Sequence, residues 1–259
     1  MSFDIQQPTI PTPTRTPTLP GLLSVVDWVG SPLDAQRSIS GAKYQPGVTN
    51  PTLREWVDEG TKVSTSSPAF RNAVVTTPYL RRKFSGGEGT YAELRDKTIA
   101  DFEDGLEGYV VRRLISTATV VDISPGGDCP LVAAVGLLER ALWATNGQRR
   151  GYVVASPLVS PRFTAYTEND YVLPSGNRLV YSAGAISAAE LTTLDEQPAD
   201  VTLYACAQPF GHKSYGVTSE QTGDDFDFDL NDVYVTVEGT VALGFDSSVQ
   251  LLACTNSSV

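Results

Sequence analysis

The segment from Tyr91 to Leu114 constrains the fold most, because its residue pattern predicts one long helix with a single apolar side. Thr90 and Glu93 stand three positions apart at its start, as a capping box requires. Gly105 and Gly108 would each weaken an isolated helix by about 1 kcal/mol relative to Ala. We therefore expect a sheet or another subunit beneath this helix, which would be about 35 Å long. The apolar side consists of Tyr91, Leu94, Thr98, Ile99, Phe102, Leu106, Tyr109, Val110 and Leu114.

The N-terminal region is rich in proline. Between Gln7 and Gly21, five prolines stand among five threonines, and this spacing favours extended, polyproline-like chain over helix or central strand. Such a segment is either a loose tail or an arm that becomes ordered along a neighbouring molecule. The apolar patch Leu22–Trp28 could anchor an arm of this kind.

The segment before the long helix predicts strands. Turn residues dominate positions 31 to 51, so we expect irregular chain there with at most a strand. Val63–Phe84 is rich in β-branched and aromatic residues, which favours a β-hairpin. A two-stranded ribbon is marginal in water, so this hairpin would need a partner.

A basic triplet ends this predicted hairpin. Such a cluster is usually solvated, but facing the acidic C-terminal half of another copy it would provide electrostatic complementarity. We therefore predict a subunit interface on this segment, formed by Phe70, Val74, Tyr79, Arg81, Arg82 and Lys83.

The C-terminal half predicts a small α/β unit followed by two strands. We expect a helix at Leu131–Asn146, with Val132, Val135, Leu138, Leu142 and Trp143 on its buried side. Strands are expected at residues 117–123, at 151–156 with both faces buried, at 178–182 and at 201–206, and a turn or short helix at 157–166. Residues 233–243 and 249–254 predict a final antiparallel pair, which would form an apolar floor for the long helix.

Charge and cysteine content narrow the class of protein. The net charge is −11, and the excess lies beyond residue 113, where 6 basic and 17 acidic residues follow 13 of each. A surface this acidic repels phosphate, which argues against a sequence-specific nucleic-acid reader. Cys129, Cys206 and Cys254 are widely spaced and odd in number, so we expect buried thiols in a soluble protein made in a reducing cytoplasm. No apolar run reaches the roughly 20 residues of a membrane helix, and no secretory signal is evident.

Signals for catalysis or metal binding are weak. His212 is the only histidine and has no acid at useful spacing, so it predicts no catalytic triad. Leu230 and Thr236 stand where a calcium loop starting at Asp225 needs Gly and Glu. We expect a solvated strand face there, with a loose divalent-cation site at a subunit contact as the alternative, and we expect no enzyme, cofactor or resident metal. The acidic run consists of Asp225, Asp227, Asp229 and Asn231.

In its order of elements, the chain resembles the major capsid proteins of tailed bacteriophages, a fold shared with encapsulin shells. Gly151–Pro157 and Val237–Asp246 are similar to capsid sequences of actinobacteriophages. The resemblance implies an α+β fold with an N-terminal arm (1–30) and an axial α/β subdomain (129–220). It also implies a peripheral domain (31–128 and 221–259) that contains an extended β-hairpin loop (60–88), a long spine helix (90–115) and C-terminal strands.

The resemblance also implies a function. We expect a structural subunit that assembles with itself into pentamers and hexamers of an icosahedral virion shell around double-stranded DNA. Scaffold, portal and decoration proteins would be further partners, DNA contact would be non-specific, no membrane would be involved, and assembly would occur in the host cytoplasm. Alternatives are a virion accessory protein, such as a decoration or tail component, and a hydrolase whose carboxylates converge in the fold.

Overall fold

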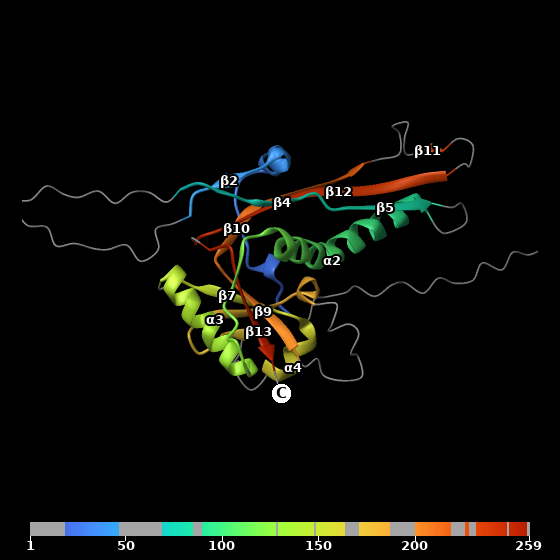
Figure 1. Ribbon diagram of the computed structural model, residues 1–259. Coiled ribbons are helices and arrows are strands. Elements are labelled where there is room, and N and C mark those ends of the chain that lie inside the picture. Colours follow the sequence, from blue (N-terminus) through green and yellow to red (C-terminus); the bar gives the residue numbers. More distant parts are fainter. Residues whose placement is uncertain are drawn as a thin grey trace, which may run out of the picture.

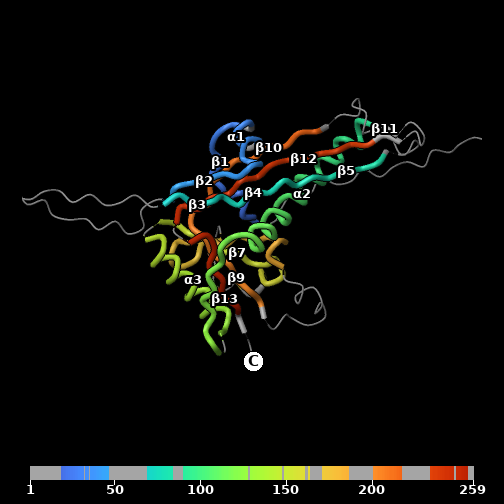
Figure 2. Tube along the Cα trace, turned by 45° about the horizontal axis from the view of Figure 1, so that its top comes forward, coloured from blue at the N-terminus to red at the C-terminus, as the bar shows by residue number. Residues whose placement is uncertain are grey.

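The computed structural model describes residues 19–46, 69–84, 90–127, 129–147, 149–163, 171–186, 200–218, 226–227, 232–247 and 249–257. They form an elongated upper layer, in which α2 lies under a sheet, and a compact lower body around a second sheet and α3 (Figure 1). The upper layer extends well past one side of the body, as the Cα trace also shows (Figure 2). None of the described helices is long and apolar enough to cross a membrane.

The predicted long helix is α2, which spans Tyr91–Thr117. Its capping box is confirmed, since Glu93 N–H donates to Thr90 Oγ1 (3.3 Å) and Thr90 N–H donates to Glu93 Oε2 (2.8 Å). The buried side of α2 differs from the predicted apolar side at one place, because Tyr109 is 48% exposed while Val111 is buried. The helix packs against both the upper sheet and the lower body, so its buried side is broader than one stripe. Its buried residues are Thr98, Phe102, Val110, Val111 and Leu114.

The upper sheet is organised around its longest strand, β12 (Asp232–Phe245). β10 (Pro209–Thr218) pairs with β12 on one side, and β1 (Asp27–Trp28) pairs in parallel with β10. β4 (Val74–Thr76) and β5 (Tyr79–Phe84) pair with the other side of β12, and β11 (Phe226–Asp227) pairs with its start. β2 (Lys43–Tyr44) and β3 (Arg71–Asn72) form a separate two-stranded sheet.

The prediction of a hairpin within residues 63–84 is wrong for residues 69–84. Residues 63–68 lie outside the described part of the chain. β4 and β5 follow each other along β12 and do not turn back on one another. The reason lies at Pro78, which has no N–H to donate but accepts a hydrogen bond from Gly239 N–H (2.9 Å). The chain therefore continues along the edge of β12.

The lower body holds the second sheet, in the order β6 (Val120–Asp122), β13 (Leu251–Ser257), β9 (Asp200–Ala207), β7 (Gly151–Ala155) and β8 (Arg178–Tyr181). These strands confirm those predicted near residues 120, 153, 180 and 203, and all five residues of β7 are buried. The predicted turn or short helix at 157–166 is confirmed as far as residue 163 by η3 (Pro157–Val159) and α4 (Ser160–Phe163). A further turn, η5 (Ala183–Ala185), follows β8.

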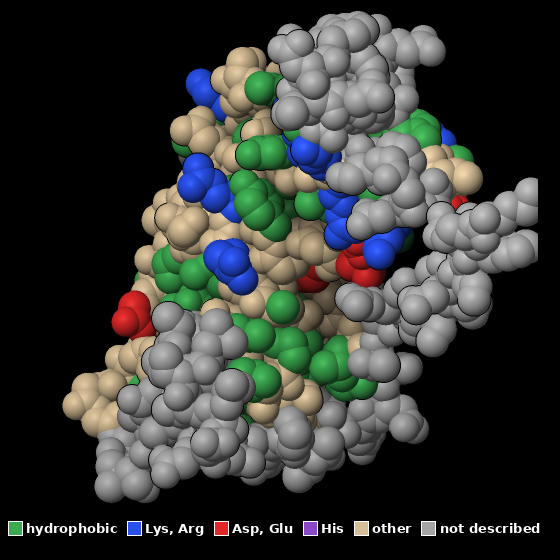
Figure 3. Space-filling view, turned by 90° about the vertical axis from the view of Figure 1, so that its right-hand side faces the viewer, with side chains coloured by type: hydrophobic (Ala, Val, Ile, Leu, Met, Phe, Trp, Pro, Cys, Tyr) green, Lys and Arg blue, Asp and Glu red, His purple; other side chains and the backbone are tan. Residues whose placement is uncertain are grey.

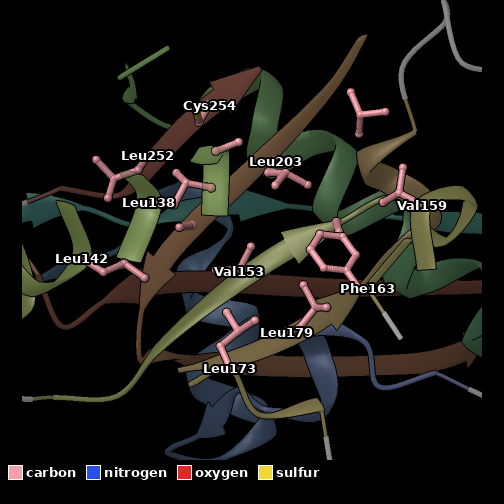
Figure 4. Close-up of a cluster of buried hydrophobic side chains, with 14 of the residues drawn as sticks. Leu138, Leu142, Val153, Val159, Phe163, Leu173, Leu179, Leu203, Leu252 and Cys254 are labelled. Atoms are coloured by element: carbon pink, nitrogen blue, oxygen red, sulfur yellow. The ribbon is translucent and has the colours of Figure 1, made fainter. Parts of the chain in front are cut away.

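The predicted helix α3 (Leu131–Asn146) is confirmed, but its predicted buried side is partly wrong. Val132 is 52% and Trp143 61% exposed, because the buried positions recur every four residues and lie on another stripe. Figure 4 shows Leu138 and Leu142 of this helix beside Val153, Leu179 and Leu203 of the sheet. The buried residues of α3 are Ala134, Leu138, Leu142 and Asn146.

Two stretches of chain cross from one sheet to the other. The predicted antiparallel pair near the C-terminus is wrong, because β12 belongs to the upper sheet and β13 to the lower one. β9 and β10 form the second such stretch. β10 pairs with β12 in the upper sheet, and β9 pairs with β13 in the lower one. Asp246 N–H donates to the Gln208 carbonyl (3.1 Å) where both stretches change sheet. A strand at β10 and a helix at α1 (Pro32–Arg37) were not predicted from the sequence.

Candidate assembly surface

The two faces of β5 have different neighbours. Arg82 faces α2 and forms an ion pair with Asp101, with 2.5 Å from Nη2 to Oδ2. Arg81 points to the opposite face, where its guanidinium lies 4.2 Å from the centre of the Tyr234 ring. Strand alternation places Tyr79 and Lys83 on the same face as Arg81. This face, which we call the outer face of the upper sheet, is the one turned away from α2.

The six residues of the predicted interface separate into exposed and internal members. Phe70 and Tyr79 are 68% and 73% exposed, and Arg81 and Lys83 are also exposed. Val74 is 6% exposed and packs in the interior with Leu22 and Phe245. Arg82 is partly buried in its ion pair with α2. Two aromatic and two basic members of the predicted set are therefore exposed at the surface.

Basic side chains are exposed at the right-hand end of the molecule. Figure 3 looks at the right-hand end of Figure 1, and several Lys and Arg side chains lie in the upper half of the described surface, with fewer acidic ones. The net charge of the whole chain is −11. The described surface therefore offers basic groups that an acidic region of another copy would complement.

Glu107 fixes the start of the described chain to α2. Its two carboxylate oxygens accept the backbone N–H groups of Leu22 and Leu23, each at 2.8 Å. Burial raises the pKa of Glu107, although the hydrogen bonds from Leu23, Leu22 and Ser182 act in the opposite direction. A Cβ at Gly21 would lie 2.8 Å from the Glu107 carboxyl carbon, so a larger residue at this position would displace the carboxylate.

Further contacts hold the same N-terminal segment along both layers. Tyr181 N–H donates to the Pro20 carbonyl (2.7 Å), and the Gln208 side-chain amide donates to the Val25 carbonyl (2.9 Å). Leu22 and Val26 are buried, in agreement with the predicted anchoring patch at residues 22–28. Sequence reasoning missed Glu107, because a carboxylate that binds backbone groups 84 and 85 positions away leaves no local spacing signal.

The remaining candidates for catalysis or metal binding are the histidine, the three cysteines and the acidic run. His212 Nδ1 lies 2.5 Å from the Val29 carbonyl oxygen, next to Gly30. The three cysteines are free and buried, as predicted, and burial raises the pKa of Cys206 to about 12 and, with Cys129 nearby, that of Cys254 to about 11. Of the acidic run, Asp227 lies in β11, whereas Asp225, Asp229 and Asn231 lie outside the described residues. The described residues contain no cluster of three or more potential metal ligands.

Comparison with known proteins was informative only at the level of structure, since no family model and no curated protein sequence matches the chain. The fold is similar to the capsid of an empty GTA particle, with a TM-score of 0.57 at 11% identity, over 97% of this chain and 95% of the other. The mature capsid of bacteriophage PhiM1 matches with a TM-score of 0.51 at 10% identity, over 100% and 93%. A chain from Mycobacterium phage Bobi matches with a TM-score of 0.51 at 12% identity, over 98% and 96%.

This chain has the major capsid protein fold of tailed bacteriophages. The capsid fold agrees with the predicted α+β class and accounts for the long helix between two sheets. Of the extended loop predicted at 60–88, residues 60–68 and 85–88 lie outside the description. In the described part of that loop, β3 pairs with β2, and β4 and β5 lie along β12.

Proposed function

We propose that the chain is a structural subunit that assembles with itself into the icosahedral shell of a tailed phage, enclosing double-stranded DNA. The observation that carries this proposal is the full-length match of the capsid fold, over 97% of this chain and 95% of the capsid chain of a GTA particle. A match of this extent includes the upper layer as well as the compact body. It therefore favours a container subunit over a protein that shares one small domain with capsids.

The exposed residues support self-association. The upper layer extends past the lower body (Figure 1). Phe70, next to β3, is 68% exposed, and Tyr79 of β5 is 73% exposed, with Arg81 and Lys83 also exposed along β5. Aromatic residues and Arg are enriched in protein interfaces, whereas Lys is more common outside them. Contacts between two different surfaces of the same chain form closed rings where the rotation from copy to copy closes. The proposed interface therefore consists of the exposed members of the predicted set.

The two layers suggest how the subunit is divided. We assign the axial region to the lower body around α3 and β7, and the peripheral region to α2 and the upper sheet. This assignment differs from a boundary at residue 220, because β10 belongs to the upper sheet and β13 to the lower one. Pentamers and hexamers would form around the axial region, with scaffold, portal and decoration proteins as further partners in the host cytoplasm.

The test is the mass and shape of the purified protein. After expression, negative-stain electron microscopy and analytical ultracentrifugation should reveal closed particles or capsomer rings. The Tyr79→Ala/Arg81→Glu double variant should lose particles while it keeps the melting temperature of the wild type. Lys97→Glu, an exposed charge reversal on α2, is the matched control and should still assemble.

Other outcomes would identify other functions. Small discrete oligomers at every concentration would favour an accessory virion protein, and a monomer would overturn the shell proposal. A hydrolase would require paired carboxylates in a desolvated pocket. The partly buried Glu107 instead binds the backbone of the N-terminal segment.

A further inference from the structure

Two of the three buried cysteines lie together in the lower body. Cys129 and Cys254 are 1% and 0% exposed, and both belong to the apolar cluster between α3 and the lower sheet. A hydrogen bond joins the two side chains. Figure 4 shows Cys254 among the apolar side chains of this cluster. The fold therefore brings together two thiols that are far apart in the sequence.

Backbone contacts hold the chain that precedes α3 against β13. Ile123 N–H donates to the Ala253 carbonyl (2.8 Å), and Thr255 N–H donates to Ser124 Oγ (2.9 Å). Cys254 lies between these two attachment points on β13. The position of this thiol relative to the loop that leads to α3 is therefore set by the backbone.

Cys129 lies at the end of an exposed turn. Gly126 and Gly127 are exposed before it, and Pro130 is exposed after it. A Cβ at either glycine would meet no atom within 4 Å, so the turn is surrounded by open space. Opening of this turn would expose the Cys129 thiol while α3 and the sheet stay folded.

The third cysteine is separated from this pair. Strand register places Leu203 of β9 opposite Cys254 of β13. Cys206 stands three positions after Leu203, and side chains three positions apart on a strand point to opposite faces of a sheet. In agreement, Cys206 packs in a second cluster, with Val111 of α2. The lower body therefore holds one pair of thiols and one cysteine that serves as an internal control.

We propose that Cys129 and Cys254 form an intramolecular disulfide when the protein meets a small-molecule disulfide, such as oxidised glutathione, as the oxidant. The bond joins the turn before α3 to β13. A reducing cytoplasm keeps both thiols free, so the bond forms in an oxidising medium. The inference concerns the folded chain and does not depend on assembly into a shell.

The reaction consists of two exchanges. The Cys129 thiolate attacks one sulfur of the small disulfide, forms a mixed disulfide and releases one small thiol. The Cys254 thiolate then attacks the Cys129 sulfur and releases the second small thiol. The protein thiols lose two electrons and two protons, which the small disulfide gains. Burial raises the pKa of Cys254 to about 11, so its thiol is mostly protonated near neutral pH, which favours Cys129 as the first nucleophile.

The first test maps the bond in the full-length protein. Unassembled subunits are incubated at pH 8 with oxidised glutathione, free thiols are blocked with iodoacetamide in denaturant, and tryptic peptides are analysed by mass spectrometry. The expected product is a monomer, lighter by two hydrogen atoms, in which the peptides of Cys129 and Cys254 are joined. Free thiols at both positions, or a bond to Cys206 or to another chain, would overturn the inference. Each cysteine lies on its own peptide, because trypsin cuts after Arg113, Arg140, Arg178 and Lys213.

The second test measures the effect of the bond on stability. The disulfide closes a long loop of the unfolded chain, so oxidation should raise the melting temperature of the wild type by about 5–10 °C, and dithiothreitol should reverse the shift. Cys206→Ala should show the same shift, whereas Cys129→Ala and Cys254→Ala should show none. Each variant is compared with itself with and without oxidant, so a lower starting stability does not affect the result. A shift that persists in Cys129→Ala, or no shift in the wild type, would contradict the proposal.

The order of the two exchanges can be trapped. Cys254→Ala keeps the first thiol without its partner, so it should accumulate one glutathione on Cys129, detected by intact mass and peptide mapping. Cys129→Ala should stay unmodified at position 254 over the same time, because Cys254 is buried on a strand that pairs with both β6 and β9. The reverse result would overturn the assignment of Cys129 as the first nucleophile.

Discussion

The lower body and the upper layer use the same kinds of elements but bury them to different extents. In the body, all five residues of β7 are buried, with α3 packed beside the sheet. In the upper layer, α2 covers one face of the sheet, whereas the outer face keeps Tyr79 73% exposed. The comparison indicates that the body supplies most of the stability of the isolated subunit, while the upper layer keeps surface for other molecules.

A core truncation should separate the two regions most clearly. Leu203→Ala removes a fully buried side chain of β9 and should lower the free energy of unfolding by roughly 2–5 kcal/mol. Tyr79→Ala in the upper layer should change it by less than about 0.5 kcal/mol, because the ring is mostly exposed. Urea denaturation followed by circular dichroism measures both. Equal losses would show that the upper layer is as important for subunit stability as the body.

The junction between the regions should tolerate little added volume. A Cβ at Gly184 would lie 2.3 Å from the Gly108 carbonyl oxygen and 2.6 Å from Arg112 N, both backbone atoms of α2. Gly184→Ala should therefore cost about 1–3 kcal/mol, measured by thermal unfolding. The control is Gly105→Ala, where a Cβ would meet nothing and better helix propensity should stabilise α2 by about 0.5–1 kcal/mol. A neutral Gly184→Ala would mean that η5 can move away from α2.

The Glu107 contact connects the N-terminal segment to both regions. Glu107→Gln replaces one acceptor oxygen by an NH₂ group that faces a backbone N–H, and it should cost about 1–2 kcal/mol at neutral pH. Limited proteolysis should also cut the variant earlier near residue 20. Asp104→Asn, an exposed change on the same helix, should alter neither property. Unchanged proteolysis of Glu107→Gln would show that the other contacts hold the segment alone.

The Glu107 carboxyl should make the stability of the protein depend on pH, and the sign of this dependence follows from its pKa. Burial raises its pKa above the ordinary value near 4.5, so the folded protein retains this proton to higher pH than the unfolded chain. Its contribution to stability is therefore present below the ordinary pKa and is lost as pH rises through the raised pKa. The stability of the wild type relative to Glu107→Gln should fall over that range in urea titrations. A rise would mean that the hydrogen bonds outweigh desolvation.

A small effect is expected at the surface ion pair of the upper layer. Arg82 and Asp101 are each about one-third exposed, so Arg82→Ala should cost no more than about 1 kcal/mol. The loss should shrink in high salt, because ions screen the pair. Arg95→Ala, at a looser pair of 3.9 Å, should cost still less in the same melting experiments. A larger loss at Arg82 would show that β5 depends on α2 for its position.

Features set by local spacing could be predicted from the sequence. The capping box of α2, the bounds of α3 and the doubly buried β7 follow from neighbouring residues. Strand partners could not be predicted, because the choice between a hairpin and the edge of β12 depends on residues far apart in sequence. β10 was missed since Pro209, Gly211 and Gly216 indicate turns when read locally.

The candidate surface could be predicted in part. Tyr79, Arg81 and Lys83 alternate along β5 and share the outer face, as strand periodicity requires. Val74 and Arg82 could not be distinguished from them, because their burial depends on the N-terminal segment and on α2. The pocket of about 640 Å³ that Tyr79 lines could not be predicted at all, because its lining residues, among them Ile39 and Glu238, are far apart in the sequence.

The two stretches that change sheet have a consequence for folding kinetics. Residues 200–218 and 232–257 each supply a strand to both sheets, and β12 must also pair with β4, far earlier in the chain. Contacts between distant residues form slowly, because the loop between them must close first. Neither sheet can be completed before the other begins, so the subunit should reach its native state in one late step. Particle growth from denatured protein would then show a lag that does not shorten with concentration.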